Sequence, residues 1–142
     1  MQNFKQKVIP KYTFCIKTGV FDLNENIPDF IKTIREEIKE KNPDIEIIDY
    51  SYFIRPINKS NDKVFINFYQ AVNKIGDEIT FKFENQPSAH VLSCAHNPNY
   101  PTIDGTYSDL FDYLDVASYK INGNIREVYT ENGMELQIPY TT

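Results

Sequence analysis

Two polar side chains, Glu135 and Gln137, alternate with apolar residues in the segment MELQIPY near the end of the sequence. Successive side chains of a strand point to opposite faces, so these two are expected on one face and Leu136 and Ile138 on the other. A carboxylate among aromatic rings attracts an organic cation through Coulomb and cation–π forces. It could also act as a general base if burial raised its pKa. The alternative is an acid that only meets water, as most glutamates do.

Further candidates lie on two other predicted strands. In REVY, Glu127 and Tyr129 have the same parity and share a face, and Glu127 has the same two interpretations as Glu135. The sequence does not fix whether the two glutamates share a face. On the strand KVFINFYQ, the alternating residues Phe65, Asn67 and Tyr69 are expected to face away from the helix. The candidate ligand-binding residues are Glu135, Glu127, Tyr129, Tyr69, Phe65, Asn67, Gln137 and Tyr100.

His90, Cys94 and His96 share parity on one predicted strand, which raises the question of a metal site. A metal site needs three or four converging ligands, and the sequence has no C-x-x-C or H-x-x-x-H spacing. We interpret both cysteines as free thiols that pack as small hydrophobes. The P-loop, G-x-G-x-x-G and G-x-S-x-G motifs are absent. We therefore expect no metal and no cofactor, and the sequence assigns no catalytic residue.

The elements that would position these residues fall into two similar halves. In the first, YTFCIKTG predicts a strand. NIPDFIKTIREEIKEKNP predicts a helix, because Ile27, Phe30, Ile34 and Ile38 recur at helical spacing behind Asn26 as a cap. DIEIIDYSYFIRPI and KVFINFYQAV predict two strands joined by the turn NKSND. The first half is therefore a β-α-β-β unit.

The second half repeats this order after the seam NKIGDE. EITFKFEN predicts an extra strand, with Ile79, Phe81 and Phe83 on one face. SAHVLSCAHNPNY predicts a strand that runs into a turn. PTIDGTYSDLFDYLDV predicts a helix with Tyr107 on its packing stripe, although Gly105 weakens the first turn. INGNIREVY and MELQIPY predict the closing hairpin.

The duplication predicts an α+β fold in which two helices cover one side of an antiparallel sheet. The chain of 142 residues suits one domain, with repeats at about 5–73 and 78–140. Ten Tyr and ten Phe suit both pleated sheets and ligand pockets.

The composition excludes several classes of protein. The net charge is −5 and no basic cluster is present, so direct nucleic-acid binding is not expected. No apolar run approaches the roughly 18 residues of a membrane span, and the start MQNFKQKVIPKY has no secretory pattern. We expect a cytoplasmic protein that is a monomer or a homodimer.

The segments SAHVLSCAHNPNYPTIDGTYSDLFDYL, REVY and ELQIPY together resemble the GyrI-like effector-binding domain, in its stand-alone form. This is the ligand domain of many AraC-type and MerR-type multidrug regulators. The family pattern is H-x-G-P-Y, a helix with spaced Tyr and Leu, R-E-[IV]-Y and E-[IV]-x-I-P. The matching residues are His96, Tyr100, Tyr107, Leu110, Leu114, Arg126, Glu127, Val128, Tyr129, Glu135, Ile138 and Pro139. Pro98 stands where the family has Gly, and the chain has no Trp.

The resemblance implies a cleft between the two repeats, lined by aromatic rings and holding acidic residues. In multidrug-sensing members this cleft takes lipophilic cations. The expected function is thus to bind or sequester small amphipathic molecules, cationic or aromatic, in connection with transcriptional regulation. Two alternatives stay open. One is a hydrolase of reactive electrophiles that uses a cleft glutamate, and the other is a gyrase-inhibitor-like module that binds a protein partner.

Overall fold

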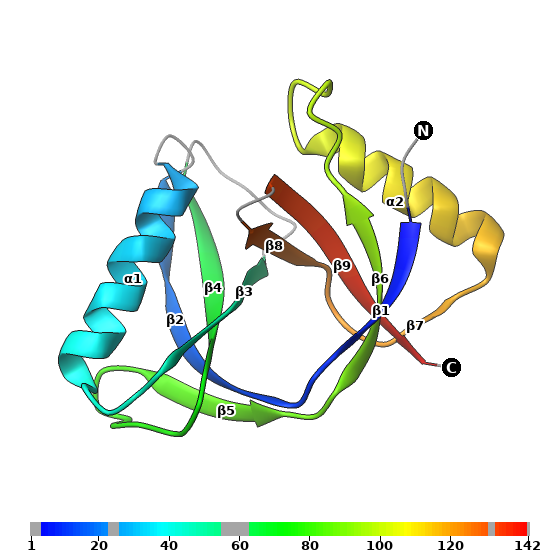
Figure 1. Ribbon diagram of the computed structural model, residues 1–142. Coiled ribbons are helices and arrows are strands. Elements are labelled where there is room, and N and C mark those ends of the chain that lie inside the picture. Colours follow the sequence, from blue (N-terminus) through cyan, green and yellow to red (C-terminus); the bar gives the residue numbers. More distant parts are fainter. Residues whose placement is uncertain (1–3, 23–25, 55–62, 131–132, 142) are drawn as a thin grey trace. The chain divides into compact units, whose positions relative to one another are not determined.

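The computed structural model describes residues 4–22, 26–54, 63–130 and 133–141 (Figure 1). The chain forms two compact units, each described here by itself. Lys11–Pro87 form the middle unit, and Met1–Pro10 with Ser88–Thr142 form the terminal unit. The described elements are β1 (Phe4–Ile9), β2 (Tyr12–Asp22), α1 (Ile27–Lys41), β3 (Ile47–Ile54), β4 (Lys63–Val72), β5 (Lys82–Gln86), β6 (Ala89–Ala95), α2 (Asp104–Ala117), β7 (Lys120–Ile121), β8 (Arg126–Thr130) and β9 (Gly133–Thr141).

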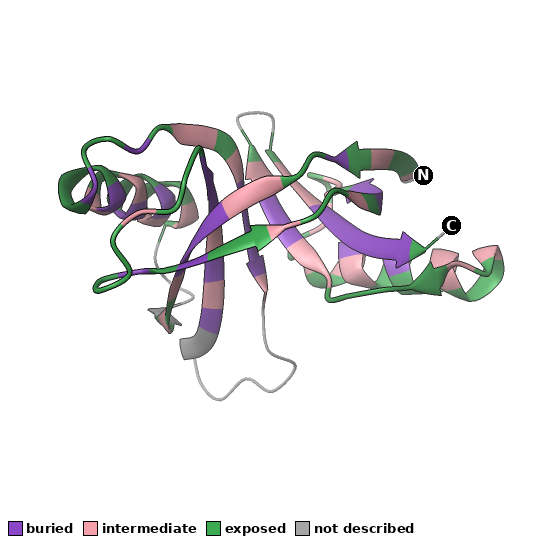
Figure 2. Cartoon of the chain, turned by 90° about the horizontal axis from the view of Figure 1, so that it is seen from below, coloured by how far each residue is buried: buried purple, intermediate pink, exposed green. Residues whose placement is uncertain are grey.

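The middle unit is an antiparallel sheet in the order β3-β4-β2-β5, with α1 alongside it (Figure 1). The helix buries Ile31, Ile34 and Ile38, and Figure 2 shows its buried and exposed residues on different sides. On the sheet, the ring of Phe68 meets that of Phe30 at 6.1 Å between centroids. Each fully buried isoleucine stabilises such a core by about 1.5–3 kcal/mol.

The terminal unit repeats this arrangement with the order β1-β6-β9-β8, and β7 also pairs with β9. Helix α2 packs its buried Leu110 against one face of the sheet. The sheet side of this core contains Leu92, Cys94, Leu136, Ile138 and Tyr140. The ring of Phe4 from β1 stacks on Tyr113 of α2, with centroids 4.1 Å apart.

The structure confirms the predicted α+β class and the repeated element order. Each of β2-α1-β3-β4 and β6-α2-β8-β9 is a β-α-β-β unit, with the short β7 added in the second. The prediction for Ile79 was wrong. This residue lies in a turn and is 90% exposed, whereas Phe81 and Phe83 are buried. Strand β5 begins only at Lys82, because the residues before it form a turn.

The helix ends follow local chemistry. Asn26 caps α1 as predicted, since its Oδ1 accepts from the backbone N–H of Asp29 at 3.1 Å. Gly105 in the first turn of α2 has a packing role, because a Cβ there would lie 2.7 Å from Cδ2 of Tyr100. The glycine lets that ring lie against the helix at a small cost in helix propensity.

No helix in the described part of the chain has both the length and the apolar character needed to cross a membrane.

Candidate functional site

Glu127 on β8 is completely removed from solvent. It lies opposite Leu136 in the β8–β9 ladder, and therefore on the side of the sheet that α2 covers. The hydroxyl of Tyr107 donates to its Oε2 at 2.5 Å, and the hydroxyl of Tyr129 donates to its Oε1 at 3.4 Å. Both tyrosines are half-buried. A carboxylate in the apolar interior thus has phenol hydroxyls on both oxygens and aromatic rings beside it.

Glu135 on β9 has a different environment. Its register partners are Val128 and Ala95, so it lies on the face away from α2. The ammonium of Lys7 donates to both carboxylate oxygens at 3.1 and 3.0 Å, and the amide of Gln137 donates to Oε2 at 3.0 Å. Burial by itself would raise the pKa of Glu135. Hydrogen bonds from Gln137 and Lys7, together with the lysine's charge, outweigh burial and hold the pKa below its ordinary value.

The register therefore separates the two glutamates that the sequence left unplaced. The side chains of Glu135 and Gln137 lie on one face of β9, and those of Leu136 and Ile138 lie on the other, as alternation requires. Glu127 shares the face of Leu136 instead. The two carboxylates do not converge on one concavity of the terminal unit, and each needs its own test.

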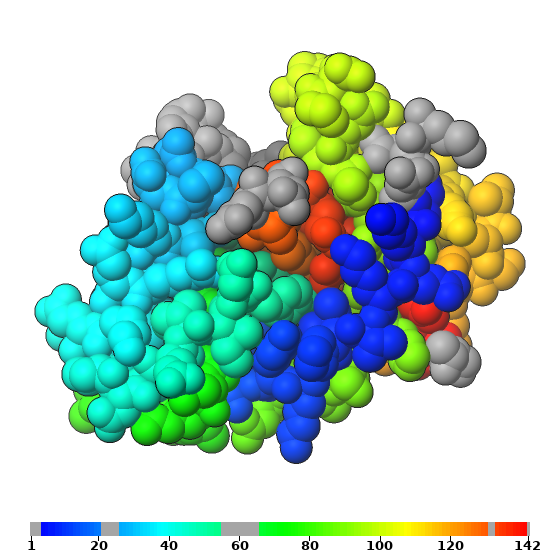
Figure 3. All heavy atoms as spheres, in the orientation of Figure 1, coloured from blue at the N-terminus to red at the C-terminus, as the bar shows by residue number. Residues whose placement is uncertain are grey.

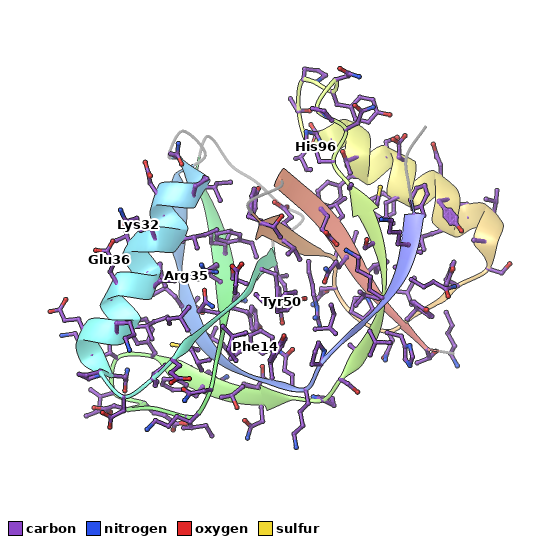
Figure 4. All side chains as sticks on the ribbon, in the orientation of Figure 1. Phe14, Lys32, Arg35, Glu36, Tyr50 and His96 are labelled. Atoms are coloured by element: carbon purple, nitrogen blue, oxygen red, sulfur yellow. The ribbon has the colours of Figure 1, made fainter. Side chains whose placement is uncertain are left out.

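The middle unit carries a cluster of aromatic rings on the side of its sheet opposite to α1. This aromatic face consists of Tyr12, Phe14, Tyr50, Tyr52 and Tyr69. Tyr52 and Tyr69 are register partners, and their rings stack at 4.6 Å with an interplanar angle of 7°. Phe14 meets both edge-on, at 5.4 and 6.0 Å. Figure 4 shows Phe14 and Tyr50 near one another on this side.

Three rings of the aromatic face retain contact with solvent. Tyr12, Tyr50 and Tyr69 are half-buried, whereas Phe14 and Tyr52 are only 1% and 2% exposed. Tyr12 also stacks on Tyr50 at 5.6 Å. Such a surface offers flat, polarisable contacts for aromatic or cationic molecules. Edge-on and stacked pairs of this kind add about 0.5–1.5 kcal/mol each beyond area burial.

The other predicted residues have the following positions. Asn67 is half-buried on β4, and its Oδ1 accepts from the hydroxyl of Thr18 at 2.6 Å. Phe65 belongs to β4, but its side chain lies outside the described residues. The hydroxyl of Tyr100 donates to Asp109 at 2.6 Å, which ties the turn after β6 to α2.

A buried amide supports the aromatic face from behind. Gln70 is fully buried on the α1 side, and its Nε2 donates to the carbonyl oxygens of Ile48, Ala71 and Tyr50 at 2.7, 3.0 and 3.3 Å. The register of β3 shifts between Ile47 and Ser51, and the carbonyls of Ile48 and Tyr50 belong to this irregular stretch. The Nε of Arg35 on α1 donates to Oε1 of Gln70 at 2.7 Å. Sequence reasoning missed this network, since a bulge has no clear local signal here.

His96 belongs to a further polar cluster in the terminal unit. Its Nδ1 lies 2.5 Å from the hydroxyl oxygen of the fully buried Thr106, in the first turns of α2 (Figure 4). Within the described residues, no group of three or more His, Cys, Asp or Glu side chains is arranged to hold a metal ion.

Comparison with known proteins extends these observations. No family model matches the chain, and no curated protein matches it. Among solved structures, the C-terminal domain of EcmrR superposes with a TM-score of 0.78 at 19% identity, over 100% of this chain and 99% of that domain. In the cryo-EM structure of an EcmrR–DNA complex, the TM-score is 0.77 at 20% identity, over 99% of this chain and 58% of the EcmrR chain.

Other solved structures match at lower TM-scores. A hydrolase from Listeria innocua matches with a TM-score of 0.63 at 8% identity, over 99% of this chain and 92% of that chain. SAV2435, solved bound to tetraphenylphosphonium, matches with a TM-score of 0.55 at 9% identity, over 98% of this chain and 94% of that chain. The chain therefore has the fold that these proteins share. One of them was solved with a bound ligand, and another is a domain of a protein that was solved on DNA.

Proposed function

We propose that this chain is an effector-binding domain that takes up small amphipathic molecules, cationic or aromatic, in connection with transcriptional regulation. The observation that carries the proposal is the carboxylate of Glu127, fully buried with tyrosine hydroxyls on both oxygens. The likeness to the EcmrR domain and to ligand-bound SAV2435 supports the same direction.

Glu127 suits an organic cation for electrostatic reasons. A carboxylate inside a protein interacts with a cation far more strongly than one in water, because the surroundings screen the charges less. The hydroxyls of Tyr107 and Tyr129 stabilise the anion, while their rings offer π faces to the same cation. Both rings reach solvent and the carboxylate does not, so a cation would pack against the rings and interact with the buried charge behind them.

The aromatic face of the middle unit is the second surface in this proposal. It is a separate surface, which would take aromatic molecules by itself through half-buried rings such as Tyr50 and Tyr69. Its contribution can be measured separately from that of Glu127. A Tyr69→Leu variant removes a ring from the stack with Tyr52 while keeping an apolar side chain of similar width.

The test uses two probes of the same shape and opposite charge, tetraphenylphosphonium and tetraphenylborate, in isothermal titration calorimetry. The cation should bind to the wild type and the anion should not. Glu127→Gln should weaken cation binding about tenfold or more, which is the usual scale for losing one charge-assisted contact. Glu135→Gln is the matched control, because Lys7 already neutralises that carboxylate.

Three outcomes would contradict the proposal or redirect it. Equal affinity for both probes would show that binding does not depend on the charge of the ligand. Unchanged cation affinity in Glu127→Gln would remove that residue from the site, and a loss confined to Glu135→Gln would move the site to β9. Mass spectrometry of the recovered probes and of reactive electrophiles would show whether the chain returns them intact or hydrolyses them.

A further inference from the structure

A groove of about 900 Å³ runs along α1 and reaches the beginning of β3, entirely within the middle unit. Its apolar lining comes from Pro28, Ile31 and Ile47. Figure 3 shows the outer surface of α1, in cyan, without other segments lying over it. The volume lies within the range of sites that hold small molecules. None of the residues that line it contacts Glu127 or belongs to the aromatic face.

Arg35 gives this groove its chemistry. The side chain is 27% exposed, and its Nε is fixed by the 2.7 Å bond to Gln70, a neutral partner. Its Nη2 lies 3.4 Å from Asp49 and 3.5 Å from Ser51, both near the upper limit for a hydrogen bond. The carboxylate of Asp49 is also 77% exposed, so water screens it. The guanidinium is therefore held in a fixed orientation and has donors available for an incoming acceptor.

The charges around Arg35 narrow the class of ligand. Lys32 lies one turn earlier on the same helix and also lines the groove. Figure 4 shows Arg35 extending toward the strands, and Lys32 and Glu36 on the outer side of α1. The ammonium of Lys39 is committed to carbonyl oxygens, at 2.6 Å from that of Ile45. Glu36 and Glu40, one turn apart on α1, bring negative charge to the C-terminal half of the groove.

We propose that this groove binds small amphipathic monocarboxylates. The carboxylate is held by Arg35 and Lys32, since a guanidinium fork matches a carboxylate in geometry and charge. The apolar body lies on Pro28, Ile31 and Ile47. Glu36 repels a second or third carboxylate, so molecules such as citrate are excluded. This selectivity is local, because the net charge of −5 disfavours anions in general.

The test uses three probes with one apolar body: 4-phenylbutyrate, 4-phenylbutanol and 4-phenylbutylamine. The carboxylate should bind about tenfold or more tightly than the alcohol, and citrate should not bind. Amide chemical-shift changes should follow residues 29–40 and Ile47. Arg35→Lys, which keeps the charge but loses the fork, should weaken the carboxylate about tenfold, and Lys32→Gln should weaken it several-fold.

Lys74→Gln is the matched control for the loss of one positive charge. Lys74 is an exposed lysine of the same unit, 4.0 Å from Asp44, and does not line the groove. This variant and Glu127→Gln should bind the carboxylate as the wild type does, which separates this test from that of the proposed function. Equal affinity for carboxylate and alcohol would overturn the proposal, as would wild-type affinity in Lys32→Gln and Arg35→Lys. If Arg35→Lys fails to fold, the affinity of Lys32→Gln for the carboxylate and the map of chemical-shift changes still test the proposal.

Discussion

Replacing Gln70 by Leu should strongly destabilise the middle unit, although the two side chains have nearly the same volume. The amide is fully buried and joins three backbone carbonyls to the guanidinium of Arg35. Leucine would leave the carbonyl of Ile48 and the Nε of Arg35 without their shortest bonds, both 2.7 Å. Each buried group that loses its partner costs about 1–3 kcal/mol. With a small gain from the extra apolar contact, we expect a net loss of about 3 kcal/mol.

Urea and thermal unfolding followed by far-ultraviolet circular dichroism would measure this loss. For a chain of this size, about 3 kcal/mol corresponds to a fall in Tm of about 10 °C. Gln86→Leu is the matched control. Its half-buried amide oxygen accepts from the hydroxyl of Tyr52 at 3.2 Å, and losing this one side-chain bond should cost about 1 kcal/mol.

Hydrogen exchange would show where the damage lies. In Gln70→Leu, the amides of residues 48–51 should exchange faster, because the bulge loses its support, while those of α2 in the other unit should not change. A stability loss equal to that of Gln86→Leu would refute the reasoning. So would exchange that rises evenly along the chain, since the network would then have no local role.

Three further predictions concern charge, thiols and a cap. The pKa of Glu135 is lowered in the folded chain, so its ionised form stabilises the fold above the ordinary value of 4.5. This stabilisation is lost as the pH falls through the lower folded value. The stability of Glu135→Gln should therefore fall less steeply with acid than that of the wild type. Burial raises the pKa of Cys15 to about 12 and that of Cys94 to about 11. Iodoacetamide at pH 8 should therefore label the native chain at least a hundredfold more slowly than the urea-unfolded chain. Fast labelling of the native chain would contradict the burial of these thiols. Asn26→Ala should cost about 1 kcal/mol in urea unfolding while Asn26→Ser costs little, because serine can still accept from the backbone of the first turn.

The parts of the fold that the sequence predicts are those with local causes. Helix α1 has a cap, a stripe of isoleucines and basic residues in its last turn, and each signal lies within a few residues of the element it defines. The placement of Glu135 away from the apolar residues of β9 follows from alternation alone. Both could be predicted without knowing which strands pair.

The parts that could not be predicted depend on pairing between distant segments. The face of Glu127 is fixed by its register with Leu136 across the hairpin, and a shift of one residue would reverse it. Strand β1 pairs with β6, whose residues lie 80 to 90 positions further along the chain, as in the pair Lys7 and Val91. No local pattern specifies such a partner. The hydroxyl bond of Tyr107 to Glu127 follows from the same long-range geometry, so a ring predicted to pack also has a polar partner.

Under the proposed function, the environments of the two glutamates predict different effects on ligand binding. A cation approaching Glu135 must compete with Lys7, which bonds both carboxylate oxygens. The free energy gained from the new ion pair is then offset by the loss of the old one, and little net affinity results. At Glu127 the hydroxyls of Tyr107 and Tyr129 can keep donating while an organic cation packs against their rings. Glu127 is for this reason the carboxylate whose substitution should change ligand affinity most, and Glu135 the one whose substitution should change acid stability.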